Sequence, residues 1–499
     1  MSLAVIHTRA LLGVDAPSVQ TEVHLANGLP AFTIVGLPET AVKESKDRVR
    51  SAIVNSHFEL PQRRITVNLA PADLPKQSGR YDLAIALGIL AASEQIPSTL
   101  LNNYEFIGEL ALTGELRGVR GAIASAKACV NAKRTLICPL DNQQEAAFCA
   151  PDNSLVARSL LEVAAHLHQR VNLPSPQKEF KTENTTIYPD LADVKGQLQA
   201  RRALEVAACG GHNLLFFGPP GTGKSMLAAR LGGILPPLEN NEALDVATIQ
   251  SIIGKTNPNQ WQQRPFRAPH HTASAVALVG GGSHPRPGEI SLAHQGVLFL
   301  DELPEFPRAV LEVLREPLES GRISISRANA QVEFPAQFQL IAAMNPCPCG
   351  YAGDQTQRCR CSPQQISRYR QKISGPLLDR IDLHVPVITL PISDLHSKPQ
   401  GENSATVRAR VEHCRSLQFA RQHCANSQLK GPLLQEHCTL DQASKNLLEQ
   451  AVTKLNMSAR GYDRILRVSR TLADMAGVVD ISTTHLGEAL SYRALDRSQ

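Results

Sequence analysis

One eight-residue segment of the chain carries the residue types that bind phosphate. It follows the apolar run 213–217 and precedes a run with helical spacing, residues 226–231. Glycines in a strand–loop–helix of this kind let backbone N–H groups turn toward phosphate oxygens, and the helix N-terminus adds a favourable dipole. A lysine at its end reaches the outer phosphates, and a serine offers a hydroxyl to Mg²⁺. The segment predicts a P-loop rather than a plain glycine turn, and it consists of Gly218, Pro219, Pro220, Gly221, Thr222, Gly223, Lys224 and Ser225.

Two neighbouring carboxylates, Asp301 and Glu302, end a second apolar run, residues 297–300. At the end of a buried strand, Asp301 can hold Mg²⁺ through water while Glu302 polarises the attacking water. Together with the P-loop, this pair predicts hydrolysis of a bound nucleotide, ATP, with Ser225 and Asp301 as the Mg²⁺ ligands.

Two further side chains are candidates for the same chemistry. Asn345 closes a third apolar run, residues 338–344, and could orient the attacking water; an ordinary turn asparagine is the alternative. Arg380 lies between Asp379 and Asp382. It either forms a local ion pair or acts as an arginine finger on the nucleotide of a neighbouring subunit, which would require a ring of subunits.

Length and composition exclude several classes of protein. At 499 residues the chain has room for about three domains, and 42% hydrophobic residues with ordinary glycine and proline contents exclude collagenous and disordered chains. The net charge of +5 is mildly basic and predicts no partner by itself. The cysteine count of eleven is odd, and seven of these cysteines lie apart from one another, so they are no disulfide framework. Since no membrane-spanning run or signal peptide is evident, we expect a cytoplasmic protein.

The apolar pattern divides the chain into three parts joined by a linker. Short β-like and helical runs alternate over residues 1–175, and the polar, proline-containing stretch 176–188 is typical of a linker. Residues 189–395 hold the three continuous apolar runs, which suit strands buried on both faces of a parallel sheet. Within residues 396–499, the segments 404–424, 440–456, 458–476 and 483–495 have helical spacing. We therefore expect an α/β fold with an all-helical C-terminal domain.

In their order along the chain, the P-loop, the Asp-Glu pair, Asn345 and the segment 377–382 resemble those of an AAA+ ATPase of the magnesium-chelatase branch. Segments 265–274, 286–306 and 342–350 are similar to the ComM/YifB family, and the resemblance covers essentially the whole chain. It implies a P-loop AAA+ core with a three-layer αβα sheet, a Lon-protease-like α+β N-terminal domain and a helical lid.

The resemblance also implies roles for individual residues. Asn345 is similar to the residue called sensor 1, and Arg380 is similar to the arginine finger. Arg460 looks like the lid arginine that senses nucleotide. Arg464 and Arg467 follow on the same helical face, so which of the three touches phosphate stays open.

By the same resemblance, the expected assembly is a homohexamer that hydrolyses ATP at its subunit interfaces. The expected work is translocation on single-stranded and branched DNA, as a helicase that promotes branch migration during natural transformation. A chelatase-type or chaperone-type remodeller acting on a protein partner is the alternative, because the same motifs would serve it.

The N-terminal domain resembles the proteolytic domain of Lon at residues 74–90 and 105–139. Those proteases need a serine activated by a lysine amine. The place of the serine falls at or next to Arg80 and that of the lysine near Ile123, and Ser78 has no partner lysine where the family keeps one. We therefore expect a catalytically inactive domain. Its basic residues, which could contact phosphates or face solvent, are Lys43, Lys46, Arg48 and Arg50.

Four cysteines, Cys347, Cys349, Cys359 and Cys361, form two Cys-x-Cys pairs directly after Asn345. Four thiolates satisfy tetrahedral Zn²⁺, although this spacing is tighter than the usual Cys-x-x-Cys. Structural zinc is the favoured hypothesis, with free thiols or a redox-labile pair as the alternative.

Three segments could contact DNA in a central pore. Residues 279–286 form a glycine-rich insertion with Gly281 and Arg286, and residues 322–334 have the period-2 pattern of a β-hairpin that turns near Arg327. A hairpin that packs between subunits is the alternative. The densest basic run follows the cysteines and consists of Arg358, Arg360, Arg368, Arg370 and Lys372. His270 and His271 are expected to make structural or loop contacts.

Overall fold

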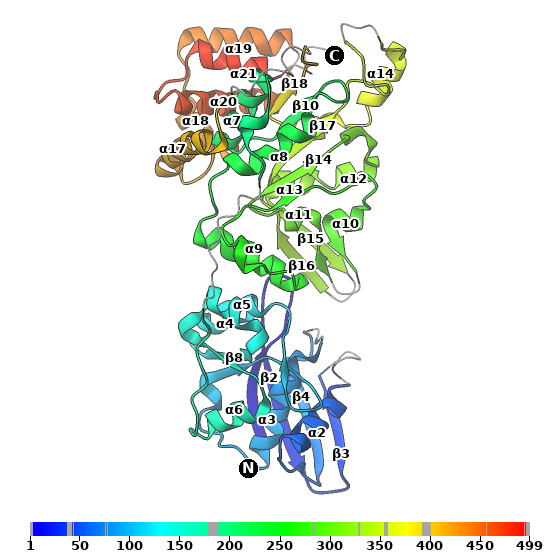
Figure 1. Ribbon diagram of the computed structural model, residues 1–499, viewed down its shortest axis with the longest axis vertical. Coiled ribbons are helices and arrows are strands. Elements are labelled where there is room, and N and C mark those ends of the chain that lie inside the picture. The colour runs from blue at the N-terminus through cyan, green and yellow to red at the C-terminus, as the bar shows by residue number, and fades with distance from the viewer. Residues whose placement is uncertain are drawn as a thin grey trace.

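The computed structural model is elongated, with the N-terminal domain at one end and the core with its helical C-terminal part at the other (Figure 1). The predicted linker, 176–188, lies outside the described residues except at its ends. Among the described residues, no helix combines the length and apolarity needed to cross a membrane. The structure describes residues 3–36, 42, 44–74, 76, 78–177, 188–282, 285–327, 330–353, 358–391, 401–455, 457–493 and 495.

The N-terminal domain is built on two main sheets and the short antiparallel pair β6–β7. The larger has the strand order β1-β2-β4-β3, in which β3 is parallel to β4 and the other pairs are antiparallel. Every residue of α3 is buried, and one side of the helix packs on β1 and β2 of this sheet. The elements are β1 (Leu3–Arg9), β2 (Ser18–Ala26), β3 (Ala31–Val35), α2 (Ser45–Asn55), β4 (Arg64–Ala70) and α3 (Asp82–Ala92).

The second sheet of this domain has three parallel strands in the order β5-β8-β9. The separate antiparallel pair β6–β7 and three helices lie in the same stretch of chain. The elements of this stretch are β5 (Tyr104–Phe106), β6 (Glu109–Leu110), β7 (Leu116–Arg117), α4 (Ala122–Asn131), β8 (Thr135–Pro139), α5 (Gln143–Cys149), β9 (Ser154–Ala157) and α6 (Leu160–Leu167).

The core contains a five-stranded, all-parallel sheet in the order β11-β14-β17-β10-β18. The three continuous apolar runs become its three central strands. Along β14, Val297 and Phe299 pack with α7 and α8, whereas Leu298 and Leu300 pack with α11 and α12 on the opposite face. The predicted α/β fold with an αβα core is thus confirmed. The strands are β10 (Leu214–Phe217), β11 (Phe266–Arg267), β14 (Val297–Leu300), β17 (Gln339–Met344) and β18 (Leu383–Pro386).

Helices and two hairpins complete the core. Helices α7 and α8 cover one face, and α10, α11, α12 and the β15–β16 hairpin cover the other. The helices and hairpin strands of the core are α7 (Leu198–Gly210), α8 (Lys224–Ile234), α9 (Asn240–Ile253), α10 (Ala275–Val279), β12 (Gly280–Gly281), β13 (Arg286–Pro287), α11 (Glu289–Leu292), α12 (Arg308–Glu312), α13 (Arg315–Ser320), β15 (Arg322–Arg327), β16 (Ala330–Pro335), α14 (Pro363–Arg370) and α15 (Gly375–Leu378).

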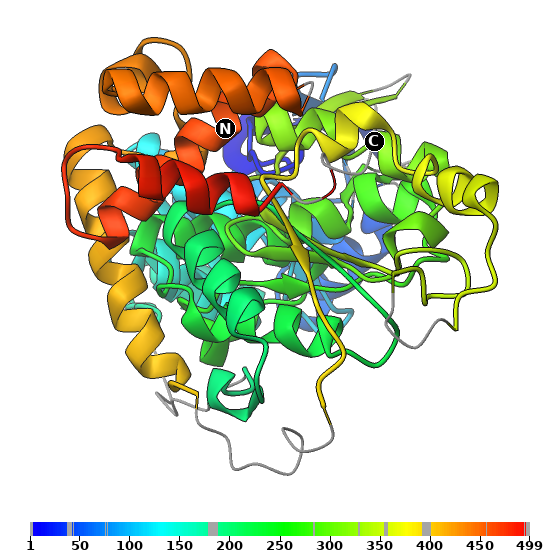
Figure 2. The ribbon, with the colours of Figure 1, turned by 90° about the horizontal axis from the view of Figure 1, so that it is seen from above.

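The C-terminal part is helical, as predicted, and lies beside α7 and α8, away from the projecting α14 (Figure 2). The short helix α18 was not predicted, because its six residues are too few to show a helical period. The helices are α17 (Ser404–Gln422), α18 (Pro432–His437), α19 (Gln442–Lys454), α20 (Ala459–Met475) and α21 (Thr483–Ser491).

The N-terminal domain docks on the core in two places. The rings of Phe148 and Trp261 stack with their centroids 4.3 Å apart, and the Thr256 hydroxyl donates to Glu145 Oε1 at 2.8 Å. The turn between β1 and β2 packs on the β15–β16 hairpin, where a Cβ on Gly13 would lie 2.4 Å from Val332 Cγ1. The hairpin predicted from the sequence is present. Part of its surface is covered by the N-terminal domain of the same chain.

Candidate active site

The P-loop connects the end of β10 to the start of α8. Gly223 has φ +91°, a left-handed conformation that favours glycine, and Lys224 begins the helix. The Lys224 ammonium donates to the carbonyls of Gly218 and Pro219, each at 2.8 Å, and to Asn345 Oδ1 at 3.1 Å. Burial lowers the pKa of Lys224. The predicted phosphate ligand and the predicted sensor 1 are thus in direct contact.

The two predicted Mg²⁺ ligands also meet. The Ser225 hydroxyl donates to Asp301 Oδ2 at 2.5 Å, because β14 and β10 flank β17 and their carboxyl ends share one edge of the sheet. Hydroxyl and carboxylate oxygens are ligands that Mg²⁺ prefers. A backbone loop at a helix N-terminus, an ammonium group and this oxygen pair therefore fit a magnesium nucleotide.

Glu302 follows Asp301 at the same edge and has φ +52°, an unusual conformation for a residue other than glycine. Its backbone N–H donates to Asp301 Oδ1 at 2.9 Å. Its carboxylate lies 3.2 Å from His271 Nδ1. The contact between Glu302 and His271 was not foreseen in the sequence, where His271 was expected to be a structural or loop residue.

Arg380 lies at the opposite edge of the sheet from the P-loop. It precedes β18, and the neighbouring Asp382 accepts the backbone N–H of Asn213, at the start of β10, at 2.8 Å. The four residues of β10 span about 13 Å. Arg380 is buried and forms an ion pair with Glu319 of α13. Burial lowers the pKa of Arg380, and Glu319 opposes that shift.

The lid arginines gather at this same edge and differ in their contacts. Arg460 is largely exposed and lies 3.7 Å from Glu319, beside Arg380. Arg464 forms an ion pair with Asp382; although burial favours the protonated acid, Arg464 holds the pKa of Asp382 well below its usual range. Arg467 donates to the carbonyl of Leu429 at 2.7 Å. Glu319, which no sequence motif marks, is the shared partner of Arg380 and Arg460.

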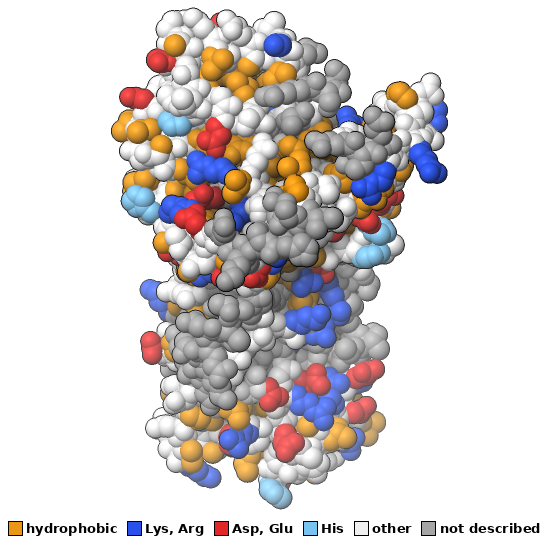
Figure 3. All heavy atoms as spheres, turned by 45° about the horizontal axis from the view of Figure 1, so that its top comes forward, with side chains coloured by type: hydrophobic (Ala, Val, Ile, Leu, Met, Phe, Trp, Pro, Cys, Tyr) orange, Lys and Arg blue, Asp and Glu red, His pale blue; other side chains and the backbone are white. Residues whose placement is uncertain are grey.

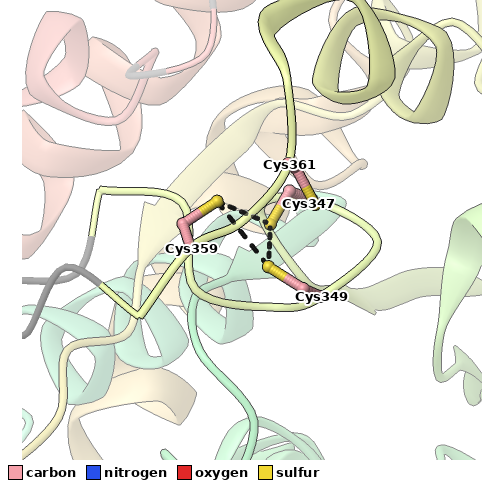
Figure 4. Close-up of side chains that lie close together, drawn as sticks. All are labelled: Cys347, Cys349, Cys359 and Cys361. Carbon is pink, nitrogen blue, oxygen red and sulfur yellow. Dashed lines mark hydrogen bonds between the residues drawn. The ribbon is translucent and has the colours of Figure 1, made fainter.

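The four clustered cysteines come together after β17, with all four Sγ atoms within 4.8 Å of one another (Figure 4). Sγ of Cys347 lies 3.3 Å from that of Cys349 and 3.7 Å from that of Cys359, and the Cys349–Cys359 distance is 3.6 Å. Cys361 completes the group. The cluster thus offers four thiol ligands to one metal ion.

Two of the predicted DNA-binding segments are antiparallel strand pairs. Gly281 pairs with Arg286 across β12 and β13, and β15 pairs with β16 up to Arg327 and Ala330. The Arg327 side chain and residues 283, 284, 328 and 329 lie outside the described residues. Lys and Arg side chains gather on the projecting α14 (Figure 3).

In the N-terminal domain, the expected place of a protease nucleophile holds the buried guanidinium of Arg80, which donates to Ser125 Oγ at 2.9 Å. Arg48, one of the four basic residues considered for phosphate contact, forms a 2.7 Å ion pair with Asp82 of the same domain. Lys43 lies outside the described residues.

Comparisons with known proteins agree with this architecture. Family models match the chain as magnesium chelatase, subunit ChlI, at residues 190–395, as subunit ChlI of Mg-chelatase at 21–142, and as the subunit ChlI C-terminal region at 401–493. The magnesium-chelatase 38 kDa subunit of Cereibacter sphaeroides is 23% identical over 327 residues, which are 60% of this chain and 90% of that relative.

Two further relatives match at full length. The competence protein ComM of Haemophilus influenzae is 52% identical over 507 residues, covering 100% of this chain and 98% of the relative. The uncharacterized protein YifB of Escherichia coli is also 52% identical, over 501 residues with the same coverage. Since identity this high extends over both whole chains, the protein belongs to the ComM/YifB family of magnesium-chelatase-like AAA+ ATPases.

Proposed function

We propose that the chain forms a homohexameric ring that hydrolyses ATP at its subunit interfaces and thereby moves along single-stranded and branched DNA. Such a helicase would promote branch migration while incoming DNA is recombined in natural transformation. The name of the relative from Haemophilus influenzae, competence protein ComM, supports this process.

The separation of the arginines from the P-loop is the observation that carries the proposal. Arg380 and Arg460 lie at the amino edge of the sheet, whereas Lys224 lies at its carboxyl edge, about 13 Å away along β10. A head-to-tail ring would bring the amino edge of one subunit to the P-loop of the next. Arg460 would then reach a neighbour's transferring phosphate directly, and the buried Arg380 would do so by leaving its ion pair with Glu319.

Among the lid arginines we assign the phosphate contact to Arg460. Arg464 is held by Asp382, and Arg467 is held by a lid carbonyl. Arg460 is 60% exposed, so it is the arginine of this group that is accessible to a neighbouring subunit.

The DNA contact is proposed for two loops on the same face of the core. A Cβ on Gly280, at the base of the β12–β13 loop, would lie 3.1 Å from Ile325 Cδ1 of the β15–β16 hairpin, so the two structures are adjacent. Gly281, Arg286 and the turn beside Arg327 would contact backbone phosphates. Binding of this kind is independent of sequence and sensitive to salt.

The test is steady-state ATP hydrolysis with and without single-stranded DNA across a salt series. The proposal predicts stimulation by DNA that fades as salt rises and is absent from Lys224→Ala and Glu302→Gln. A matched charge-removing variant, Arg286→Gln, should keep the basal rate and lose much of the stimulation. ATP hydrolysis that is robust but indifferent to DNA would contradict the proposal and favour a ring that remodels a protein partner.

A further inference from the structure

We propose that Cys347, Cys349, Cys359 and Cys361 bind one structural Zn²⁺, and that this metal fixes the P-loop and sensor 1 for ATP binding and hydrolysis. The inference rests on one part of the proposed function, the binding and hydrolysis of ATP, and not on the proposed DNA contact. Its test therefore needs no DNA.

Three of the sulfur–sulfur distances are close to those of a tetrahedral zinc site, and all four sulfurs lie within 4.8 Å of one another. With Zn–S bonds of about 2.3 Å, the sulfurs of a tetrahedron lie about 3.8 Å apart. The Cys347–Cys359 and Cys349–Cys359 distances are 3.7 and 3.6 Å, and Cys347–Cys349 is 3.3 Å. Four thiol ligands leave no coordination position for substrate, which is typical of a structural site.

The local backbone also suits a thiolate cluster. The backbone N–H of Ala352 donates to Cys347 Sγ at 3.3 Å, an interaction that stabilises negative charge on sulfur. The two Cys-x-Cys pairs approach from opposite ends of the loop (Figure 4). The Cys-x-Cys spacing, which is tighter than that of most zinc sites, is thus compatible with zinc, because each pair can supply two of the four ligands of the tetrahedron.

Two short connections join this cluster to the nucleotide site. Cys347 lies two residues after Asn345, whose Oδ1 accepts a hydrogen bond from Lys224 at 3.1 Å. Gly350, between the first two ligands and the rest of the loop, packs on Pro220 of the P-loop, where a Cβ would lie 2.8 Å from Pro220 Cδ. A displacement of the cluster would therefore reach the P-loop both along the chain and through this packing contact.

The other end of the cluster leads into α14, which is anchored next to the catalytic acids. Tyr369 of α14 is buried, and Lys372 just beyond it forms a 3.3 Å ion pair with Glu305, close after Glu302. The metal would thus lie between the strand end that carries sensor 1 and a helix fixed beside the Asp-Glu pair. In that position it would hold the two ends of the segment, residues 347–349 and 359–361, in place.

The first measurement is the zinc content of the purified full-length protein, by elemental analysis and by zinc release with a mercurial reagent. One zinc per chain is expected. Cys359→Ser/Cys361→Ser should lose the zinc, whereas Cys424→Ser, which removes a half-buried thiol outside the cluster, should keep it. Binding of a fluorescent methylanthraniloyl-ATP is then compared in the same three proteins without DNA.

We expect ATP turnover of the double variant to fall by up to about 100-fold, because a displacement of about 1 Å in the positioning groups of a site costs that much. Nucleotide affinity should fall with it, since the P-loop itself is displaced. Cys361→His, which keeps four ligands, should retain zinc and nucleotide binding even if the serine variant fails to fold. The proposal would be overturned if the wild-type protein bound no zinc when titrated. It would also be overturned if the double serine variant lost its zinc and kept its nucleotide affinity. Indifference to DNA would overturn only the proposed function.

Discussion

Nδ1 of His271 lies 3.2 Å from Oε2 of Glu302, so the carboxylate expected to polarise the attacking water is paired with an imidazole. His271 lies between β11 and α10, in the segment that leads to the β12–β13 loop. Glu302 of the ATP site therefore contacts the segment that leads to Gly281 and Arg286, which are proposed to bind DNA.

Substitution of His271 by alanine should raise the rate of ATP hydrolysis without DNA and reduce the stimulation by DNA. A contact with a charged group that is as strong as a hydrogen bond contributes about 1.5 kcal/mol, so its loss should change the ratio of the two rates by about 10-fold. The measurement is steady-state phosphate release. His270→Ala is the control, since Nδ1 of His270 contacts Thr272 Oγ1, at 2.9 Å. An unchanged ratio in His271→Ala would show that the pair has no role in coupling.

Glu302→Gln should retain ATP binding and lose about 10²- to 10⁴-fold in turnover, because the amide cannot act as a base toward water. Lys224→Ala should instead lose nucleotide affinity, since it removes the phosphate-binding ammonium. Equilibrium binding of labelled ATP separates the two effects. Glu412→Gln, which alters an exposed carboxylate on α17, is the control for Glu302. Near-normal turnover of Glu302→Gln would disprove its assignment.

The stability of the core should depend on pH through His294. Burial lowers the pKa of His294 to about 4, and its Nδ1 accepts the backbone N–H of Gln337 at 3.1 Å. Between that value and the ordinary value near 6.5, the unfolded chain binds a proton that the folded chain does not. The resulting stabilisation is complete above about pH 6.5 and is lost as the pH falls toward 4.

Thermal unfolding from pH 7 to pH 5 tests this dependence. His294→Asn should flatten the fall in melting temperature, because the amide oxygen can accept the same backbone N–H without binding a proton. An equally steep fall in the variant would mean that other groups cause the pH dependence.

Much of the ATP site was predictable because its residues lie at strand ends. The apolar runs before Gly218, Asp301 and Asn345 indicated three parallel strands, and the carboxyl ends of neighbouring parallel strands share one edge. The contacts of Lys224 with Asn345 and of Ser225 with Asp301 follow from that arrangement.

The arginine cluster was only partly predictable. Arg380 and Arg460 were identified by resemblance, but their common partner Glu319 comes from a third element, α13. Long-range packing brings these elements together, and no local pattern marks a single glutamate on a short helix. The pairing of His271 with Glu302 could not be predicted either. His271 follows β11, an edge strand of only two residues, and so short a strand leaves no pattern in the sequence that would place His271 beside Glu302.

Mixing two inactive variants tests the central claim, an ATP site shared between neighbouring subunits, most directly. Lys224→Ala lacks the phosphate-binding ammonium, and Arg380→Ala lacks the finger offered to the next subunit. In an equal mixture that exchanges subunits, about a quarter of the interfaces pair an intact P-loop with an intact arginine. The account predicts that ATP hydrolysis returns toward that fraction of the wild-type rate, whereas a mixture as inactive as its components would contradict it.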